Sequence, residues 1–215
     1  MRTSSTPAAT MPPIHTVLLD ADGVVQLPRP GWLASLAALC GDTDRTDEFL
    51  TDVFAAEKPS LEGRADFEPA LAAVLRQWRS SVPVTDALRI WTEIEPSADT
   101  LGVVRALRSA GVTVALATNQ QAHRANHMTN ALRYAEHFDH LLYSCELGHA
   151  KPSPGFFSSA LARTATEPAR ALFIDDDEAN VMAARDAGLH AEVYHLSQGA
   201  ARLHEILRGH GLRVT

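Results

Sequence analysis

Short apolar segments alternate with amphipathic segments from residue 96 onward, and this alternation limits the possible fold more than any other feature. The segments 112–119, 140–144, 171–177 and 190–196 are typical of buried strands, and the stretches between them have the three- and four-residue spacing of helices. Repeated strand–helix units favour a parallel sheet covered by helices on both faces. We therefore expect an α/β fold.

The first 95 residues divide differently. MRTSSTPAATMPP, residues 1–13, is rich in Ser, Thr and Pro and predicts a disordered tail without a secretory signal. Ile14–Leu19 predicts a buried strand, and 31–91 has helical periodicity throughout. We expect an α/β core of residues 14–28 and 96–215, interrupted by a helical domain of residues 29–95.

Composition excludes some classes of function. A formal net charge of -7 argues against a nucleic-acid or anionic membrane surface as the main partner, although a local pocket can still bind a small anion. No apolar run approaches the roughly 20 residues of a transmembrane helix. Cys40 and Cys145 are too few and too far apart for a disulfide framework, so we expect a protein of the reducing cytoplasm.

Polar residues stand at the predicted strand ends, where open parallel sheets bind their ligands. Together they offer the carboxylates, hydroxyl, amide and ammonium of a metal-assisted phosphoryl-transfer site. They are Asp20 and Asp22 after the first strand, Thr118 and Asn119 after the second, Lys151 in the loop after the third, and Asp175 and Asp176 after the fourth.

The spacing of Asp20 and Asp22 indicates two roles. Residues i and i+2 of an extended backbone point the same way, so both carboxylates can face one pocket. Asp20 would attack phosphorus and form an aspartyl-phosphate. Asp22 would protonate the leaving oxygen and then activate water. Gly23 lets the backbone turn directly after them.

The other polar residues suit Mg²⁺ and phosphate. Mg²⁺ prefers carboxylates, water and substrate oxygens, and we place it on Asp20, the carbonyl of Asp22 and Asp176. Asp175 and Asn180 would support those ligands through hydrogen bonds. The side chains that would meet the phosphoryl group are Thr118 and Asn119, which would hydrogen-bond its oxygens, and Lys151, which would neutralise charge on it and on Asp20.

These four segments resemble the four signature motifs of the haloacid dehalogenase superfamily over residues 14 to about 195. The matches are Asp20 and Asp22 in the first motif, Thr118 in the second, Lys151 in the third, and Asp175, Asp176 and Asn180 in the fourth. The resemblance implies a Rossmann-like core, Mg²⁺ dependence and phosphatase chemistry. Residues 29–95 look like the small helical cap of the phosphoglycolate phosphatase and β-phosphoglucomutase-like subgroup, in which Arg64 would approach the substrate.

Several alternatives remain beside a phosphatase that acts on a small phosphorylated metabolite. The dehalogenases of the superfamily lack the second acid of the first motif, so Asp22 favours phosphate over halide chemistry. A phosphomutase has the same motifs, and a non-catalytic binding or regulatory module can share the fold. An EF-hand needs a glycine and a glutamate at positions that this chain does not supply, and we regard His123 and His127 as a chance pair rather than a zinc site. We expect a monomer or a homodimer.

Overall fold

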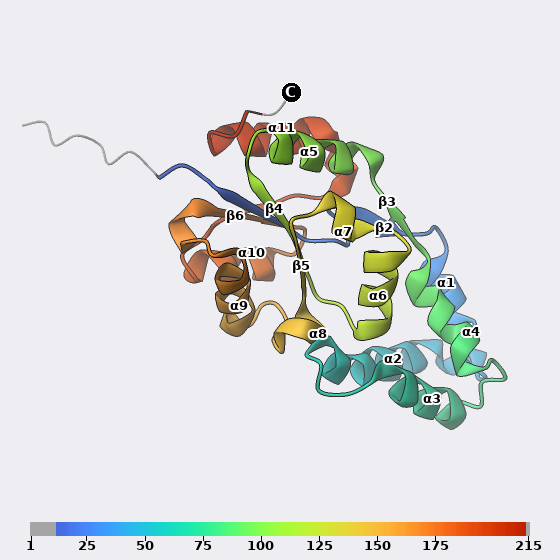
Figure 1. Cartoon of the computed structure of the whole chain (residues 1–215). Helices are drawn as coiled ribbons and strands as arrows, with labels where there is room; N and C mark the ends of the chain where they lie inside the picture. The colour runs from blue at the N-terminus through green and yellow to red at the C-terminus, as the bar shows by residue number, and fades with distance from the viewer. Residues whose placement is uncertain (1–11, 214–215) are drawn as a thin grey trace, which may run out of the picture.

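Five parallel strands form the central sheet of the computed structural model, which describes residues 12–213 (Figure 1). The strand order is β5-β4-β1-β6-β7, which confirms the predicted α/β fold. The predicted tail 1–13 lies outside the described residues except for Pro12 and Pro13, which have no regular structure. The strands are β1 (Thr16–Leu19), β4 (Thr113–Thr118), β5 (His140–Tyr143), β6 (Ala171–Asp175) and β7 (His190–Val193).

Side chains of β1 alternate between two hydrophobic clusters, because successive residues of a strand point to opposite faces. Val17 and Leu19 pack with residues of α5, α6, α7 and α11, whereas Leu18 packs with residues of α9 and α10. The sheet is thus buried on both faces, as its almost continuous apolar strands predict. These helices are α5 (Ala98–Ser109), α6 (Ala122–Asn130), α7 (Tyr134–His137), α9 (Pro154–Thr164), α10 (Glu178–Asp186) and α11 (Gly199–Gly209).

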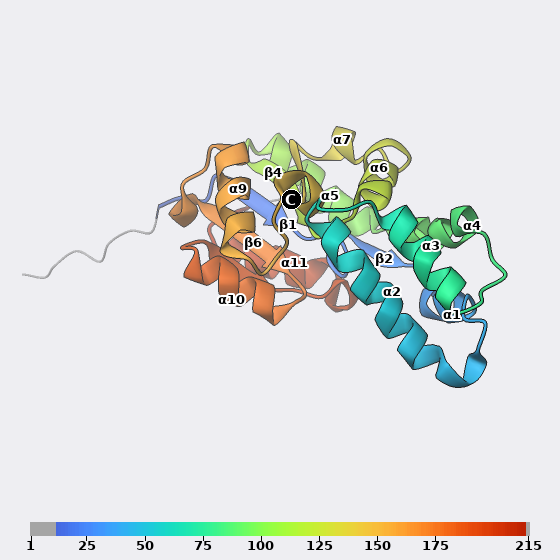
Figure 2. The ribbon, with the colours of Figure 1, turned by 90° about the horizontal axis from the view of Figure 1, so that it is seen from below.

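Residues 29–95, which we call the helical unit, project to one side of the sheet (Figure 2). Their side chains form a hydrophobic cluster of their own, in which Phe49, Trp78 and Trp91 are buried. A two-stranded antiparallel ribbon connects the unit to the core. The elements are α1 (Trp32–Ala37), α2 (Thr46–Leu61), α3 (Phe67–Gln77) and α4 (Val84–Arg89), with β2 (Gln26–Pro28) and β3 (Ile94–Pro96) in the ribbon.

Several short elements differ from the prediction. Two helices rather than one lie between the predicted strands 112–119 and 140–144: α6 ends at Asn130, and α7 begins separately at Tyr134 after Arg133, whose φ of 56° is left-handed. A further short helix, α8 (Ser144–Leu147), stands where a loop was expected. Short 3-10 turns cover Thr43–Arg45, Ile90–Thr92, Pro168–Arg170 and Leu196–Gln198.

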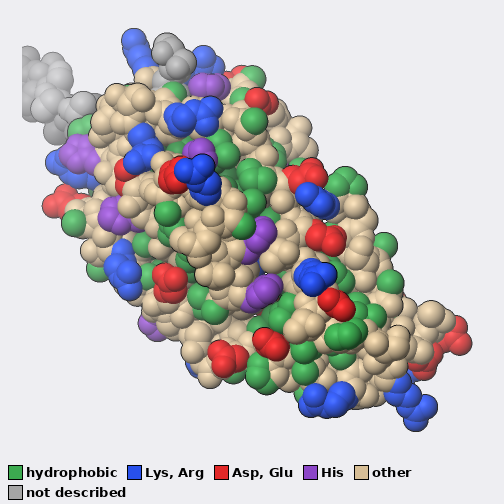
Figure 3. All heavy atoms as spheres, turned by 45° about the vertical axis from the view of Figure 1, so that its right-hand side comes forward, with side chains coloured by type: hydrophobic (Ala, Val, Ile, Leu, Met, Phe, Trp, Pro, Cys, Tyr) green, Lys and Arg blue, Asp and Glu red, His purple; other side chains and the backbone are tan. Residues whose placement is uncertain are grey.

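Acidic and basic side chains are interspersed over the face of the molecule shown in Figure 3. Charge of a single sign is therefore not concentrated on that face. Of the helices within residues 12–213, none is both long enough and apolar enough to cross a bilayer.

Candidate active site

The ends of three neighbouring strands bring the predicted acids and the predicted hydroxyl together. Asp20 follows β1, and its backbone N–H extends the ladder to β6 by donating to the carbonyl of Ile174 over 2.9 Å. Thr118 ends β4 and Asp175 ends β6, on either side of β1. The residues that line the resulting cleft of about 390 Å³ are Asp20, Asp22, Gly23, Leu27, Pro28, Thr118, Asn119, Lys151, Asp176, Asp177 and Asn180.

Lys151 joins two of the carboxylates. Its Nζ lies 2.7 Å from Oδ1 of Asp20 and 2.6 Å from Oδ2 of Asp175. All three residues are buried, and Asp175 has no exposed surface. Since a buried charge is tolerated only when it is paired, the ammonium and the two carboxylates depend on one another.

The pKa values of this group follow from its burial. Removal from water is the main reason that the pKa of Asp20 rises from 3.8 to about 7. The Lys151 ammonium opposes this rise and the charge of Asp175 adds to it. Burial by itself lowers the pKa of Lys151, but the charges of Asp20 and Asp175 outweigh it and raise that pKa above its ordinary value. Lys151 is therefore protonated, and Asp20 needs further positive charge to be fully ionised at neutral pH.

Asp175 and Asp176 have different surroundings. Both oxygens of Asp175 accept hydrogen bonds. Oδ1 accepts from the backbone N–H of Asp177 over 2.8 Å, and Oδ2 accepts from Nζ of Lys151. The side-chain amide of Asn180 lies 3.2 Å from each of the two oxygens and donates to them. Asp176 is partly buried and lines the cleft, and its burial, followed by the charge of Asp175, raises its pKa. Asp176 is thus the carboxylate of the pair that is available to a ligand.

The acids at this edge fit a divalent cation. Asp20, Asp175 and Asp176 each offer an oxygen atom, and these atoms all lie within 4.8 Å of one another. Gly23 leaves room for the same group, because a Cβ atom at this position would lie 2.1 Å from Oδ2 of Asp176. An all-oxygen donor set of this kind suits Mg²⁺, with Asp20 and Asp176 as ligands and Asp175 hydrogen-bonded behind them.

Asn119 has partners other than those expected. Its Nδ2 donates to the backbone carbonyl of Lys151 over 2.9 Å, and its Oδ1 accepts from the backbone N–H of Lys151 over 2.8 Å. The side-chain amide therefore holds the loop that carries Lys151, and its role toward a phosphoryl oxygen stays a prediction. Thr118 is buried, and its Oγ1 accepts from Nε2 of Gln120 over 3.2 Å.

Asp22 has partners that the sequence analysis missed. Arg124 forms an ion pair with it, and Gln26 and Gln120 also donate to its carboxylate. Gln120 could have been found, because it stands two residues after Thr118 at a strand end and two-residue spacing keeps side chains on one side. Gln26 and Arg124 carry no such signal, since neither belongs to a motif.

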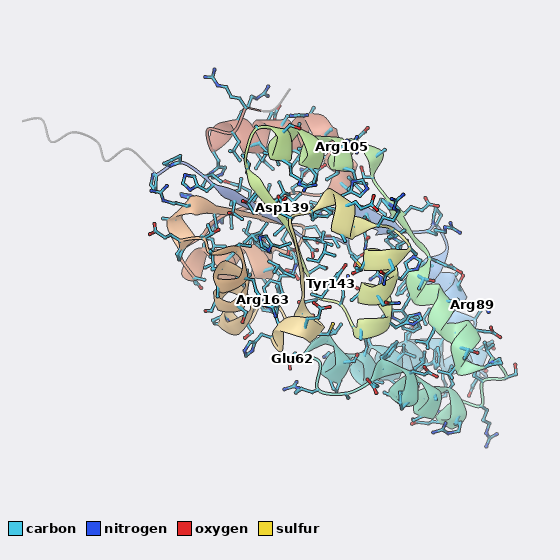
Figure 4. All side chains as sticks on the ribbon, viewed as in Figure 1. Glu62, Arg89, Arg105, Asp139, Tyr143 and Arg163 are labelled. Atoms are coloured by element: carbon cyan, nitrogen blue, oxygen red, sulfur yellow. The ribbon has the colours of Figure 1, made fainter. Side chains whose placement is uncertain are left out.

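The structure does not bring Arg64 to the other predicted residues. Its side chain is 70% exposed and pairs with Glu62. Figure 4 shows Glu62 at the end of α2, beside α8. Among the described residues, Arg64 is not one of those that line the cleft. The preceding residue, Gly63, packs closely on α8, because an added Cβ there would lie 2.3 Å from the carbonyl oxygen of Cys145.

The fold and this constellation of side chains define a family. The model of the haloacid dehalogenase-like hydrolases matches residues 14–188, and the chain belongs to this family of enzymes. This is the superfamily that the four motifs resemble. The finer assignment to the phosphoglycolate phosphatase and β-phosphoglucomutase-like subgroup stays a prediction.

Curated relatives match only part of this chain. Bifunctional epoxide hydrolase 2 of Mus musculus is 29% identical over 108 residues, which are 48% of this chain and 20% of that protein. Bifunctional riboflavin kinase/FMN phosphatase of Arabidopsis thaliana is 38% identical over 90 residues, which are 40% of this chain and 23% of that protein. The matched segments thus span about a fifth of the length of these relatives.

Solved structures share the fold over almost the whole chain. A HAD family enzyme of Bacteroides thetaiotaomicron has a TM-score of 0.77 at 20% identity, with 89% of this chain and 98% of that chain covered. The same enzyme in complex with magnesium and inorganic phosphate gives 0.75 at 20% identity, with 88% and 98% covered. A HAD phosphatase of Thermococcus onnurineus gives 0.70 at 17% identity, with 91% and 99% covered. At these identities the likeness concerns the fold.

Proposed function

We propose that this hydrolase is a Mg²⁺-dependent phosphatase that hydrolyses a small phosphate monoester through an aspartyl-phosphate on Asp20. The observation that carries the proposal is the position of Lys151, whose Nζ bonds Oδ1 of Asp20 over 2.7 Å at the mouth of a cleft that also holds Asp22 and Thr118. Within residues 12–213, Oδ2 of Asp20 accepts no hydrogen bond, so this oxygen is free to act as a nucleophile.

The first half of the reaction uses Asp20 and Asp22. Oδ2 of Asp20 forms a bond to phosphorus while the bond between phosphorus and the leaving oxygen breaks, and its electron pair goes to that oxygen. Asp22 gives this oxygen a proton. Thr118 donates to a phosphoryl oxygen, and Lys151 offsets the negative charge that gathers around phosphorus.

The second half returns both carboxylates to their starting states. A water oxygen attacks phosphorus, Asp22 takes a proton from that water, and the bond to Asp20 breaks with its electron pair returning to Asp20. Mg²⁺ held by Asp20, the carbonyl of Asp22 and Asp176 would supply positive charge beside the nucleophile and the phosphoryl oxygens. Charge at that position also offsets the raised pKa of Asp20.

The helical unit is proposed as the cap that selects the substrate. It is joined to the core next to the cleft, because Leu27 and Pro28 of β2 belong both to the ribbon and to the cleft lining. Leu27 is 45% exposed and offers an apolar surface beside the acids. A cap that closes there would exclude water from the reacting groups.

Two comparisons support phosphate as the substrate group. One curated relative is named as an FMN phosphatase, and one similar structure is described in complex with magnesium and inorganic phosphate. Both Cys40 and Cys145 are free, which is consistent with the cytoplasm as the proposed compartment.

The test is hydrolysis of an aryl phosphate by the purified chain with Mg²⁺, with EDTA, and with Asp20→Asn. We expect activity with Mg²⁺ only, and a loss of about 10³-fold or more in Asp20→Asn. Asp177→Asn is the matched control, because Asp177 lines the same cleft while its side chain caps α10. Activity that survives in Asp20→Asn contradicts the mechanism, and a wild type that is inactive on a broad panel of phosphate monoesters contradicts the function.

A further inference from the structure

Four hydrogen-bond donors surround the carboxylate of Asp22. Nη1 and Nη2 of Arg124 lie 2.9 Å from Oδ2 and 2.7 Å from Oδ1, which makes the contact bidentate. Nε2 of Gln26 donates to Oδ1 over 3.0 Å, and Nε2 of Gln120 donates to Oδ2 over 2.9 Å. Each oxygen therefore has one guanidinium donor and one amide donor.

Among the described residues, the guanidinium of Arg124 donates hydrogen bonds to Asp22 alone. Its side chain is 14% exposed, and its Nε is buried without a hydrogen-bond partner among the described residues. Its backbone is fixed as well, because Oε1 of Gln121 caps α6 and accepts from the N–H groups of His123 and Arg124. A buried guanidinium needs compensation, and Asp22 supplies it.

Gln26 is anchored from the other side. It is fully buried, and its Oε1 accepts from the hydroxyl of Tyr134 over 2.8 Å. Gln120 is different, because its Nε2 is shared between Asp22 and Oγ1 of Thr118. Among the described residues, the Gln120 amide is thus the only one of the four donors that also contacts a residue of the proposed phosphoryl site. An attacking water that takes the place of this amide would find a lone pair on Oδ2 of Asp22 on the side of Thr118.

We propose that Arg124 is a positioning residue that aims the carboxylate of Asp22 at the attacking water in the second half of the reaction. The inference rests on the phosphatase function proposed above. A planar guanidinium that binds both oxygens fixes the rotation of the carboxylate as well as its place, which a single amide donor cannot do.

Arg124→Met separates the two halves of the reaction when 4-nitrophenyl phosphate is the substrate. Nitrophenolate leaves without being protonated, so Asp20 can still be phosphorylated, whereas attack by water still needs Asp22. Rapid-quench kinetics with Mg²⁺ should therefore show a burst of nitrophenol close to one per site, an accumulated phosphoenzyme, and a kcat lowered about tenfold to a hundredfold. A loss of fold alone would lower kcat without a burst.

Two further variants complete the experiment. Arg108→Met is the matched control, because Arg108 also forms an ion pair with an aspartate, Asp139, over 2.8 Å, and neither residue lines the cleft. It should leave kcat unchanged and give no burst. Arg124→Lys keeps the charge without the bidentate contact and should also show a burst, and it replaces Arg124→Met in the test if that variant does not fold.

The outcomes distinguish this inference from the function on which it rests. A wild type without turnover on any phosphate monoester overturns both. An active wild type, together with Arg124 variants that show no burst or a kcat within twofold of wild type, overturns the role of Arg124 and leaves the phosphatase function standing.

Discussion

The Nζ atom of Lys151 lies 2.6 Å from Oδ2 of Asp175, a carboxylate with no exposed surface. The same ammonium bonds the proposed nucleophile, Asp20. Lys151 therefore serves the stability of the core and the chemistry of the cleft through one group. Any change at this position should affect both properties.

Lys151→Met leaves Asp20 and Asp175 buried without their common partner. We expect the free energy of unfolding to fall by about 3–5 kcal/mol and hydrolysis to be lost. Urea denaturation in EDTA, followed by circular dichroism, measures the first effect. The double variant Lys151→Met/Asp175→Asn should recover part of the stability and none of the activity. An unchanged stability in Lys151→Met would show that the three groups are not energetically coupled.

Asp176→Asn tests the assignment of the metal ligands. Mg²⁺ at about a hundred times its dissociation constant should stabilise the wild type by about 2.7 kcal/mol, because the folded state alone holds the site. The variant should lose this stabilisation, whereas Asp177→Asn should keep it. Thermal unfolding at increasing Mg²⁺ concentration gives the comparison. Equal stabilisation of both variants would place the ion elsewhere.

Gly23→Ala adds a methyl group where Asp176 now lies. The new Cβ would be 2.1 Å from Oδ2 of Asp176, and the φ of 80° already disfavours an L side chain. We expect a loss of stability of about 1–3 kcal/mol together with weakened Mg²⁺ binding. Gly111→Ala shares the positive φ of 81° but meets no atom within 4 Å, so it should lose stability without any change in Mg²⁺ affinity. Calorimetric titration with Mg²⁺ measures the affinity of both variants, and equal affinities would contradict the close contact between Gly23 and Asp176.

Glu57 of α2 should make stability depend on pH. Burial raises its pKa from 4.5 to about 7, although Arg124 and Trp91 act in the opposite direction. The folded state therefore binds more protons than the unfolded state between these values, and the free energy of unfolding falls as pH rises through them. Glu57→Gln should match the wild type near pH 4, below the unfolded pKa, and exceed its stability by about 1–3 kcal/mol above pH 8.

Denaturant titrations of metal-free protein at the two pH values measure this difference. Glu48→Gln is the control on the same helix, because a hydrogen bond from Arg45 lowers the pKa of Glu48 and its removal should give no gain at high pH. A wild type and a Glu57→Gln variant with parallel pH profiles would contradict the raised pKa.

The sheet could be predicted from sequence because its strands are buried on both faces and appear as short apolar runs between helices. The meeting of the acids could be predicted as well, because the carboxyl ends of parallel strands lie at one edge of the sheet. The ribbon of β2 and β3 could not, because three residues are too few to show a period, and each strand contains a proline.

The surroundings of Asp22 could not be predicted either. Gln120 and Arg124 lie about a hundred residues away along the chain and reach Asp22 only because β4 pairs with β1. The partners of Asn119 likewise depend on how the loop of Lys151 passes the sheet edge. Arg64 was placed near the substrate by resemblance alone, and in the structure its exposed side chain pairs with Glu62 instead.

The β2–β3 ribbon has an evolutionary consequence. The chain leaves the core and returns to it through two paired strands, and the helical unit between them keeps a separate hydrophobic cluster. Replacing residues 29–95 by another insertion would therefore leave the five core strands and the acids at their ends in place. Mutation can therefore vary the proposed cap, while the strand ends proposed to act on phosphorus are inherited unchanged.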